Sequence, residues 1–152
     1  MTEELLAIDE LVVAYRATRS PGKIAVAGVT LAIKKGESLG LVGGSGCGKS
    51  SLAKAAMRFI DPASGRILLN GQDLLSIDKS GLRHLRPKFQ MIFQDSFTSF
   101  NPQRSIGDAV AMPLKLTGIK SRTRRAHRAH RMMERVGLAA SLYDRQIGRA
   151  HV

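Results

Sequence analysis

The sequence predicts an α/β fold, and three observations indicate it. Segments rich in apolar and β-branched residues, Leu5 to Tyr15 and Ile24 to Lys34, predict strands near the start. A short apolar run, Ser38 to Val42, leads into a glycine-rich loop and then a helical pattern. From Ile106 onward the pattern is mainly helical. With 152 residues, 43% hydrophobic and 24% charged, the chain can bury one sizeable core, and we expect one domain or part of one.

The elements of the first half follow in order. Alternation between apolar and smaller or polar residues predicts that the first two segments pair, joined by a Pro-Gly turn at Ser20 to Lys23. Ser38 to Val42 is predicted as a buried central strand. The helix behind the glycine-rich loop is expected to end before Pro62 and Gly65. Its apolar residues, at i, i+3, i+4 and i+7, are Leu52, Ala55, Ala56 and Phe59.

Two further strands are predicted: Ile67 to Leu69, ending in an Asn70-Gly71 turn, and Phe89 to Phe93. We find no internal repeat and no linker that would separate two independent domains. No apolar run approaches the roughly 18 residues that span a bilayer, and the start is acidic, so we expect a cytosolic chain. The single cysteine, Cys47, excludes an internal disulfide and leaves no metal-binding cysteine pair.

Half of the net charge of +12 lies in one segment, where seven basic residues between Lys120 and Arg135 accompany a single acidic one, Glu134. Apolar residues recur there at helical spacing, so we expect the arginines on the opposite, solvated side. A nucleic-acid-binding helix is the alternative, but no aromatic residues are interleaved for base stacking, and we favour the solvated face. The apolar stripe consists of Ala126, Ala129, Met133 and Val136.

The segment GGSGCGKS, Gly43 to Ser50, fits the phosphate-binding pattern G-x-x-x-x-G-K-[ST] between a predicted strand and a predicted helix. Residues without a bulky Cβ let successive backbone N–H groups converge on phosphate oxygens, and the helix N-terminus adds attraction for anions. Lys49 is expected to reach the β and γ phosphates, and Ser50 to bind Mg²⁺. Cys47 is either an activated thiolate or a small spacer, and we favour the spacer. The residues expected to contact nucleotide here are Gly43, Gly44, Ser45, Gly46, Cys47, Gly48, Lys49, Ser50 and Ser51.

From the start to about Arg145 the chain resembles the ATP-binding subunits of ABC transporters. Two segments carry this resemblance: VAGVTLAIKKGESLGLVGGSGCGKSSLAKAAMRFIDPASGRILLNGQDL and QMIFQDSFTSFNPQRSIGDAV. The second segment is similar to the glutamine loop of the branch that serves oligopeptide, dipeptide and nickel importers. The resemblance implies the P-loop NTPase core of an ABC ATPase, with an antiparallel β subdomain and part of the helical subdomain. It also implies ATP and Mg²⁺ as cofactors.

Two further residues receive roles from this resemblance. Tyr15 takes the place of the aromatic residue that stacks on adenine, the alternative being a tyrosine packed at a sheet edge. Gln94 takes the place of the glutamine that reaches Mg²⁺ or the attacking water, the alternative being an ordinary surface residue. Lys49 and Gln94 are thus the expected catalytic residues, and Ser50 and Gln94 the expected metal ligands.

The chain also departs from the family. Gly44, Ser51, Ser96 and Phe100 stand where this branch commonly has glutamate, threonine, proline and leucine. Beyond Arg145 we find no signature motif and no apolar strand ending in paired carboxylates. We therefore expect 1–145 to be an incomplete nucleotide-binding domain lacking its C-terminal portion, and 146–152 to be a non-native tail. Turnover is not expected from these residues alone.

The function implied is ATP binding and hydrolysis coupled to import of oligopeptides, dipeptides or a similar small solute, on the cytoplasmic face of the membrane. The implied partners are a second ATP-binding subunit, two membrane permease subunits and, indirectly, a substrate-binding protein, with no nucleic acid. The alternatives are a P-loop small-molecule kinase, which would not account for the glutamine-loop segment, and a basic nucleic-acid-binding protein.

Overall fold

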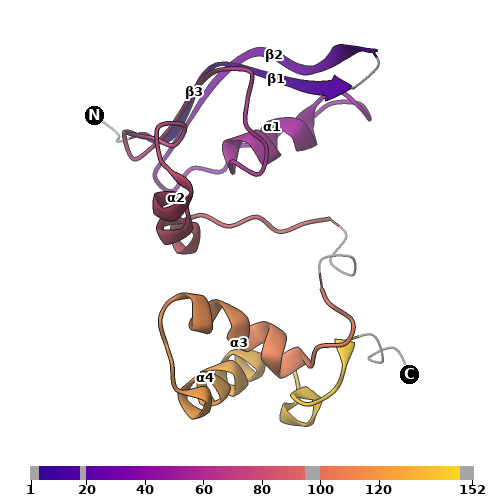
Figure 1. Ribbon diagram of the computed structural model, residues 1–152, viewed down its shortest axis with the longest axis vertical. Coiled ribbons are helices and arrows are strands. Elements are labelled where there is room, and N and C mark those ends of the chain that lie inside the picture. Colours follow the sequence, from indigo (N-terminus) through magenta and orange to yellow (C-terminus); the bar gives the residue numbers. More distant parts are fainter. Residues whose placement is uncertain (1–3, 18–19, 95–99, 148–152) are drawn as a thin grey trace. The chain divides into compact units, whose positions relative to one another are not determined.

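The computed structural model describes residues 4–17, 20–94 and 100–147 (Figure 1). It divides into two compact units, Met1–Met91 and Ile92–Val152, a division that the sequence did not lead us to expect. No helix in the described ranges is both long and apolar enough to cross a membrane.

The first unit is organised around the predicted hairpin, formed by β1 (Glu4–Ala17) and β2 (Ser20–Lys34). The two strands pair antiparallel along their length, as predicted. Because Ala17 pairs with Ser20, the segment from Ser20 to Lys23 lies in β2, and its prediction as a turn was wrong. The connection falls at residues 18–19, outside the described ranges.

An irregularity in β1 turns residues on both of its sides toward the core. Ile8, Leu11 and Val13 are all buried, although strict alternation would place Ile8 and Leu11 on opposite faces. The register shifts between these two residues, and Glu10 there has a φ of 44°. A bulge of this kind inserts an extra residue and restores the inward direction. The bulge thus positions one continuous apolar face.

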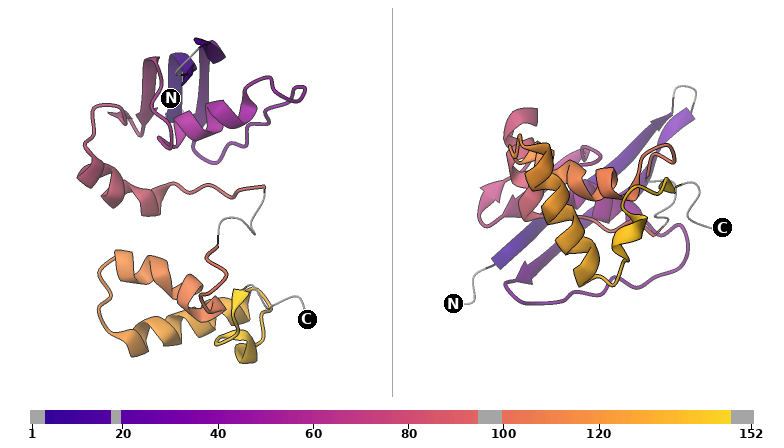
Figure 2. Two further views of the ribbon diagram at one scale, coloured as in Figure 1. Left: turned by 45° about the vertical axis from the view of Figure 1, so that its right-hand side comes forward. Right: turned by 90° about the horizontal axis from the view of Figure 1, so that it is seen from below.

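The sheet has the order β2-β1-β3-β4, with β3 (Ser64–Leu69) and β4 (Gln72–Asp73) joined through Asn70 and Gly71, as predicted. Helix α1 (Lys49–Ala56) covers one face of this sheet (Figure 2). Leu52 and Ala55 on α1 join the sheet residues in the core, which consists of Ile8, Leu11, Val13, Val26, Leu52, Ala55, Ile67 and Leu74.

Helix α1 ends earlier than predicted. Arg58 has a φ of 49°, which helical backbone cannot adopt, so Phe59 falls outside the helix and is 45% exposed. The following α2 (Lys79–Leu85) is capped by Asp78, whose carboxylate accepts from Gly81 N, and continues into the short 3₁₀ helix η1 (Arg86–Lys88). Arg86 in η1 links this segment to the end of α1, because its guanidinium donates to the carbonyl oxygens of Met57 and Arg58.

Two predicted strands, Ser38 to Val42 and Phe89 to Phe93, are absent from the described structure. Both segments are irregular, and Val42 and Ile92 are 98% and 97% exposed. A central strand needs hydrogen-bonding neighbours on both edges. Within the described ranges, every paired strand belongs to the antiparallel sheet, and none lies against either segment.

The second unit is helical, as predicted, with α3 (Ile106–Leu116) and α4 (Arg122–Arg135) side by side (Figures 1 and 2). The hydroxyls of Ser105 and Ser121 cap them, accepting from backbone N–H groups three residues on. Ala129 and Met133 are buried as expected, but Val136 lies past the end of α4 and is 65% exposed, so including it in the buried stripe was wrong.

The chain returns to the start of α3 through the 3₁₀ helix η2 (Ala140–Leu142). Tyr143 O accepts from Gly107 N at 2.8 Å, and the Tyr143 ring stacks on His130 with centroids 4.2 Å apart. Ile147 N donates to Arg104 O, which closes this unit.

Candidate nucleotide-binding site

The glycine-rich loop joins directly to α1, and Gly48 makes the junction possible. Gly48 is the N-cap of α1 with a φ of 97°, and a Cβ atom there would lie 2.1 Å from the carbonyl oxygen of Ala25 on β2. Gly46, with a φ of 81°, is a second left-handed position. Both residues need glycine for conformation, and Gly48 needs it also for its close approach to the hairpin.

The ammonium of Lys49 folds back onto the loop. Its Nζ donates to the carbonyl oxygens of Gly43 at 2.6 Å and Gly44 at 2.8 Å, and contacts Cys47 Sγ at 3.4 Å. One cation therefore holds the loop in a curved conformation. The exposed thiol of Cys47 accepts from Lys49 and packs near Gly43, where an added Cβ would lie 2.7 Å from Sγ.

The N-terminus of α1 is suited to an anion. The first N–H groups of any α-helix lack intrahelical acceptors and carry the positive end of its dipole. Here no side chain caps them, and the first turn, which includes Ser50 and Ser51, holds no acidic residue. Phosphate oxygens are the ligands that such an end binds in many proteins.

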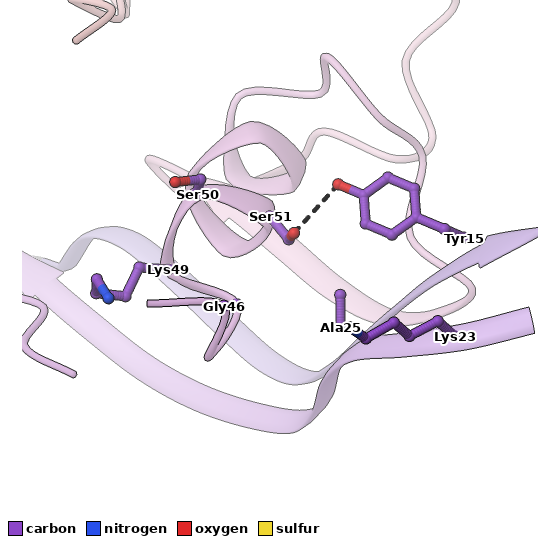
Figure 3. Close-up of a pocket in the computed structure, with 8 residues that line it drawn as sticks. Tyr15, Lys23, Ala25, Gly46, Lys49, Ser50 and Ser51 are labelled. Atoms are coloured by element: carbon purple, nitrogen blue, oxygen red, sulfur yellow. Dashed lines mark hydrogen bonds between the residues drawn. The ribbon is translucent and has the colours of Figure 1, made fainter. Parts of the chain in front are cut away.

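Tyr15 lies at the far end of the same site. Its side chain is 43% exposed, and its hydroxyl lies 3.1 Å from Ser51 Oγ. Figure 3 shows the Tyr15 ring and the Lys49 side chain at opposite ends of the site, with Gly46 between them. Together these elements line a cavity of about 260 Å³ formed by Tyr15, Lys23, Ala25, Gly46, Gly48, Lys49, Ser50 and Ser51.

The cavity includes two residues that sequence reasoning missed, Lys23 and Ala25 on β2. Lys23 pairs directly with Tyr15 across the hairpin. The predicted pairing of the two strands could have indicated Lys23, but the residue opposite Tyr15 depends on the strand register. Because Ser20 to Lys23 was predicted as a turn, Lys23 was not placed in a strand. With Lys23 and Lys49, the described lining carries two ammonium groups and no carboxylate, a balance that favours an anionic ligand.

The other predicted residues have different places. Gly43, Gly44, Ser45 and Cys47 belong to the loop beside the cavity without lining it. Gln94 belongs to the second unit, follows no strand and is exposed, so its predicted contact with metal or water remains a prediction.

The loop from Gly43 to Ser50, its junction with α1 and the cavity beside it define a site of the P-loop type. Residues 26–150 match the family model described as ABC transporter, and the chain belongs to this family. The resemblance to ABC ATP-binding subunits is thereby confirmed.

Curated relatives point to one branch of the family. The chain is 36% identical over 151 residues to a probable peptide ABC transporter ATP-binding protein, y4tS, of Sinorhizobium fredii, a match that covers 95% of this chain and 43% of the relative. It is 43% identical over 122 residues to the oligopeptide transport ATP-binding protein OppF of Salmonella typhimurium, covering 80% of this chain and 36% of OppF. The chain thus spans about two fifths of the length of these relatives.

Solved structures agree on the fold. A dimeric ATP-binding cassette in a post-hydrolysis state, bound to ADP and Pi, matches with a TM-score of 0.77 at 21% identity, covering 93% of this chain and 61% of that one. CbiO1 of Clostridium perfringens, part of an ABC transporter complex, matches with a TM-score of 0.69 at 26% identity, covering 95% and 54%. The predicted α/β cassette fold is confirmed, with only part of the domain present in this chain.

Proposed function

We propose that this chain binds ATP as the nucleotide-binding part of a peptide importer's ATP-binding subunit. The observation that carries the proposal is a cavity with an aromatic ring at one end and the P-loop lysine and helix N-terminus at the other. A nucleoside triphosphate has a matching arrangement, with a flat base that fits the aromatic end and a polyanion that fits the cationic end. The adenine would stack on Tyr15, and the phosphates would lie over the loop.

Binding requires Lys49 to change partners. Its ammonium is held by the carbonyl oxygens of Gly43 and Gly44, which are neutral acceptors. Phosphate oxygens carry full charge and form stronger, charge-assisted hydrogen bonds with an ammonium group. The β and γ phosphates would therefore draw Lys49 from the loop carbonyls. Ser50, in the first turn of α1, would bind the Mg²⁺ that accompanies ATP. Gln94 would reach Mg²⁺ or the attacking water.

The relatives support the wider role, in which the intact protein hydrolyses ATP to drive import of oligopeptides, dipeptides or a similar solute. It would pair with a second ATP-binding subunit and dock on two membrane permease subunits at the cytoplasmic face. ATP would favour the closed dimer and its hydrolysis the open one. We also propose that residues 1–145 belong to the nucleotide-binding domain and that 146–152 are a non-native tail.

Equilibrium binding of ATP and Mg²⁺ to the full 152-residue chain, followed by calorimetry, tests the proposal. Lys49→Ala should abolish measurable binding, because it removes the cation that the phosphates require. Lys54→Ala is the matched control, since Lys54 is exposed on the same helix and lies outside the cavity. Unchanged affinity in Lys49→Ala, or an equal loss in both variants, would refute the P-loop assignment.

Gln94→Ala separates the sensing role from binding. In the intact protein this variant should retain nucleotide affinity and lose coupling of hydrolysis to transport. A complete loss of nucleotide affinity would contradict the role proposed for Gln94.

A further inference from the structure

The outward face of α4 carries a straight row of arginines. They follow one another at steps of four, three and four residues, so at 100° per residue their directions fall within about 60° of arc. The row extends about 16 Å along the helix at the usual rise per residue. It lies opposite Ala129 and Met133, the buried residues of α4. We call it the arginine row: Arg124, Arg128, Arg131 and Arg135.

No described group neutralises the arginine row. All four side chains are exposed, and the described structure gives none of them a hydrogen bond or ion pair. Glu134, the single acidic residue of α4, pairs with none of them. Arg125, on another side of the helix, instead donates to the carbonyl oxygens of Ile119 and Lys120 at 2.7 and 2.6 Å. Arg125 thus stabilises the segment that precedes α4, and the arginine row has no such structural role.

The row works against the stability of its own helix. Like charges four residues apart on one helix face repel each other, and α4 has them at both Arg124/Arg128 and Arg131/Arg135. No described ion pair involves these four arginines, so none offsets this repulsion. An anionic surface outside the chain would offset it.

We propose that the arginine row contacts the acidic phospholipid headgroups of a membrane surface. A straight row on a helix fits a plane of phosphates, and guanidinium groups bind phosphate oxygens through paired hydrogen bonds. Clusters of four to eight basic residues on an amphipathic helix are typical of binding to anionic lipid. Met132, beside the row, is 47% exposed and adds an apolar side chain at its border. No aromatic residue interrupts the row to stack on bases, which favours lipid over nucleic acid.

This inference rests on the proposed function, because that function brings the chain to a membrane. It adds a direct contact with lipid to the proposed contact with permease subunits. The contact would help orient the subunit at the membrane surface.

The test is flotation of the full chain with vesicles of phosphatidylcholine and phosphatidylglycerol in equal parts, compared with phosphatidylcholine alone. We expect binding to the anionic vesicles only, weakening steeply as salt rises. Each arginine changed to glutamine should weaken binding about fivefold, and R124Q/R128Q/R131Q/R135Q more than a hundredfold. Glutamine retains helix propensity close to that of arginine, so far-ultraviolet circular dichroism should not change.

A control with equal loss of charge is K54Q/K79Q/R83Q/K88Q, whose four changed residues are exposed in the first unit. This variant should keep most of the vesicle binding. Equal losses in both variants, or equal binding to neutral vesicles, would overturn the proposal. So would tighter binding to duplex DNA than to anionic vesicles at the same salt, abolished by the same four substitutions in α4.

Nucleotide binding by the arginine-row variant separates the two proposals. Its ATP affinity should match that of the unaltered chain. The Lys49→Ala variant should instead lose ATP binding and retain vesicle binding. Failure of lipid binding alone would leave the nucleotide site standing.

Discussion

The carbonyl oxygen of Ala25 lies where a Cβ atom at position 48 would have to be, 2.1 Å from its ideal position. This approach brings β2 against the residue that precedes α1, and it helps to position the hairpin and the phosphate-binding loop next to each other. Any side chain at position 48 must separate them.

Gly48→Ala should therefore lower the free energy of unfolding by about 2 kcal/mol or more, through the left-handed backbone and the collision with Ala25. Urea unfolding followed by circular dichroism measures the loss. Gly44→Ala is the control, since Gly44 has no atom within 4 Å of an added Cβ, and it should cost less than about 0.5 kcal/mol. Similar losses at both positions would show that the contact does not set the stability.

Tyr15 offers a ring and a hydroxyl that can be tested separately. The hydroxyl contacts Ser51 at 3.1 Å in an exposed setting, so Tyr15→Phe should change stability by less than about 1 kcal/mol and keep nucleotide affinity. Tyr15→Ala should weaken ATP binding by roughly 1–3 kcal/mol through lost stacking. Calorimetric titration of both variants with ATP measures this difference. Equal affinities in the two variants would assign Tyr15 to the sheet edge rather than to adenine.

Arg86 holds the end of α1 to the segment that follows α2. Its guanidinium donates to the carbonyl oxygens of Met57 and Arg58 and lies 4.7 Å from the ring centroid of Phe59 and 5.3 Å from that of Phe89. Partial burial, and secondly the charge of Arg58, lower the pKa of Arg86 from its ordinary value. The guanidinium is thus partly desolvated, and desolvation strengthens its hydrogen bonds and its contacts with the two rings.

Arg86→Ala should accordingly destabilise the first unit by about 1–3 kcal/mol, because it leaves two carbonyl groups without their donor. Arg86→Lys should recover only part of this, since an ammonium cannot donate in a fork or stack on a ring as a guanidinium does. Arg83→Ala, at an exposed position of α2, should have little effect. Thermal unfolding of the three variants provides the comparison, and a loss confined to Arg83→Ala would contradict it.

Gly107 gives a corresponding test in the second unit. A Cβ atom there would lie 2.4 Å from the Tyr143 ring, so Gly107→Ala should displace Tyr143 from its stack on His130. We expect a destabilisation of about 1–3 kcal/mol, typical of overpacking. In a Tyr143→Ala background the same substitution should cost much less, since the colliding ring is gone. Additive losses in the double variant would show that the two residues do not interact in this way.

Local sequence was sufficient for features whose cause is local. The pattern from Gly43 to Ser50 fixed the loop and the start of the helix, because positive φ at Gly46 and Gly48 and the free N–H groups of a first turn depend on nearby residues. The Asn70-Gly71 turn, which was also predicted, is local for the same reason.

Only the tertiary structure decided what depends on distant partners. Ser38 to Val42 and Phe89 to Phe93 have the composition of strands, yet they are irregular, because a strand exists only where another strand completes its hydrogen bonds. Lys23 entered the site through a register that composition does not encode. The sequence by itself determined which chemistry the chain carries, and long-range pairing decided which residues surround it.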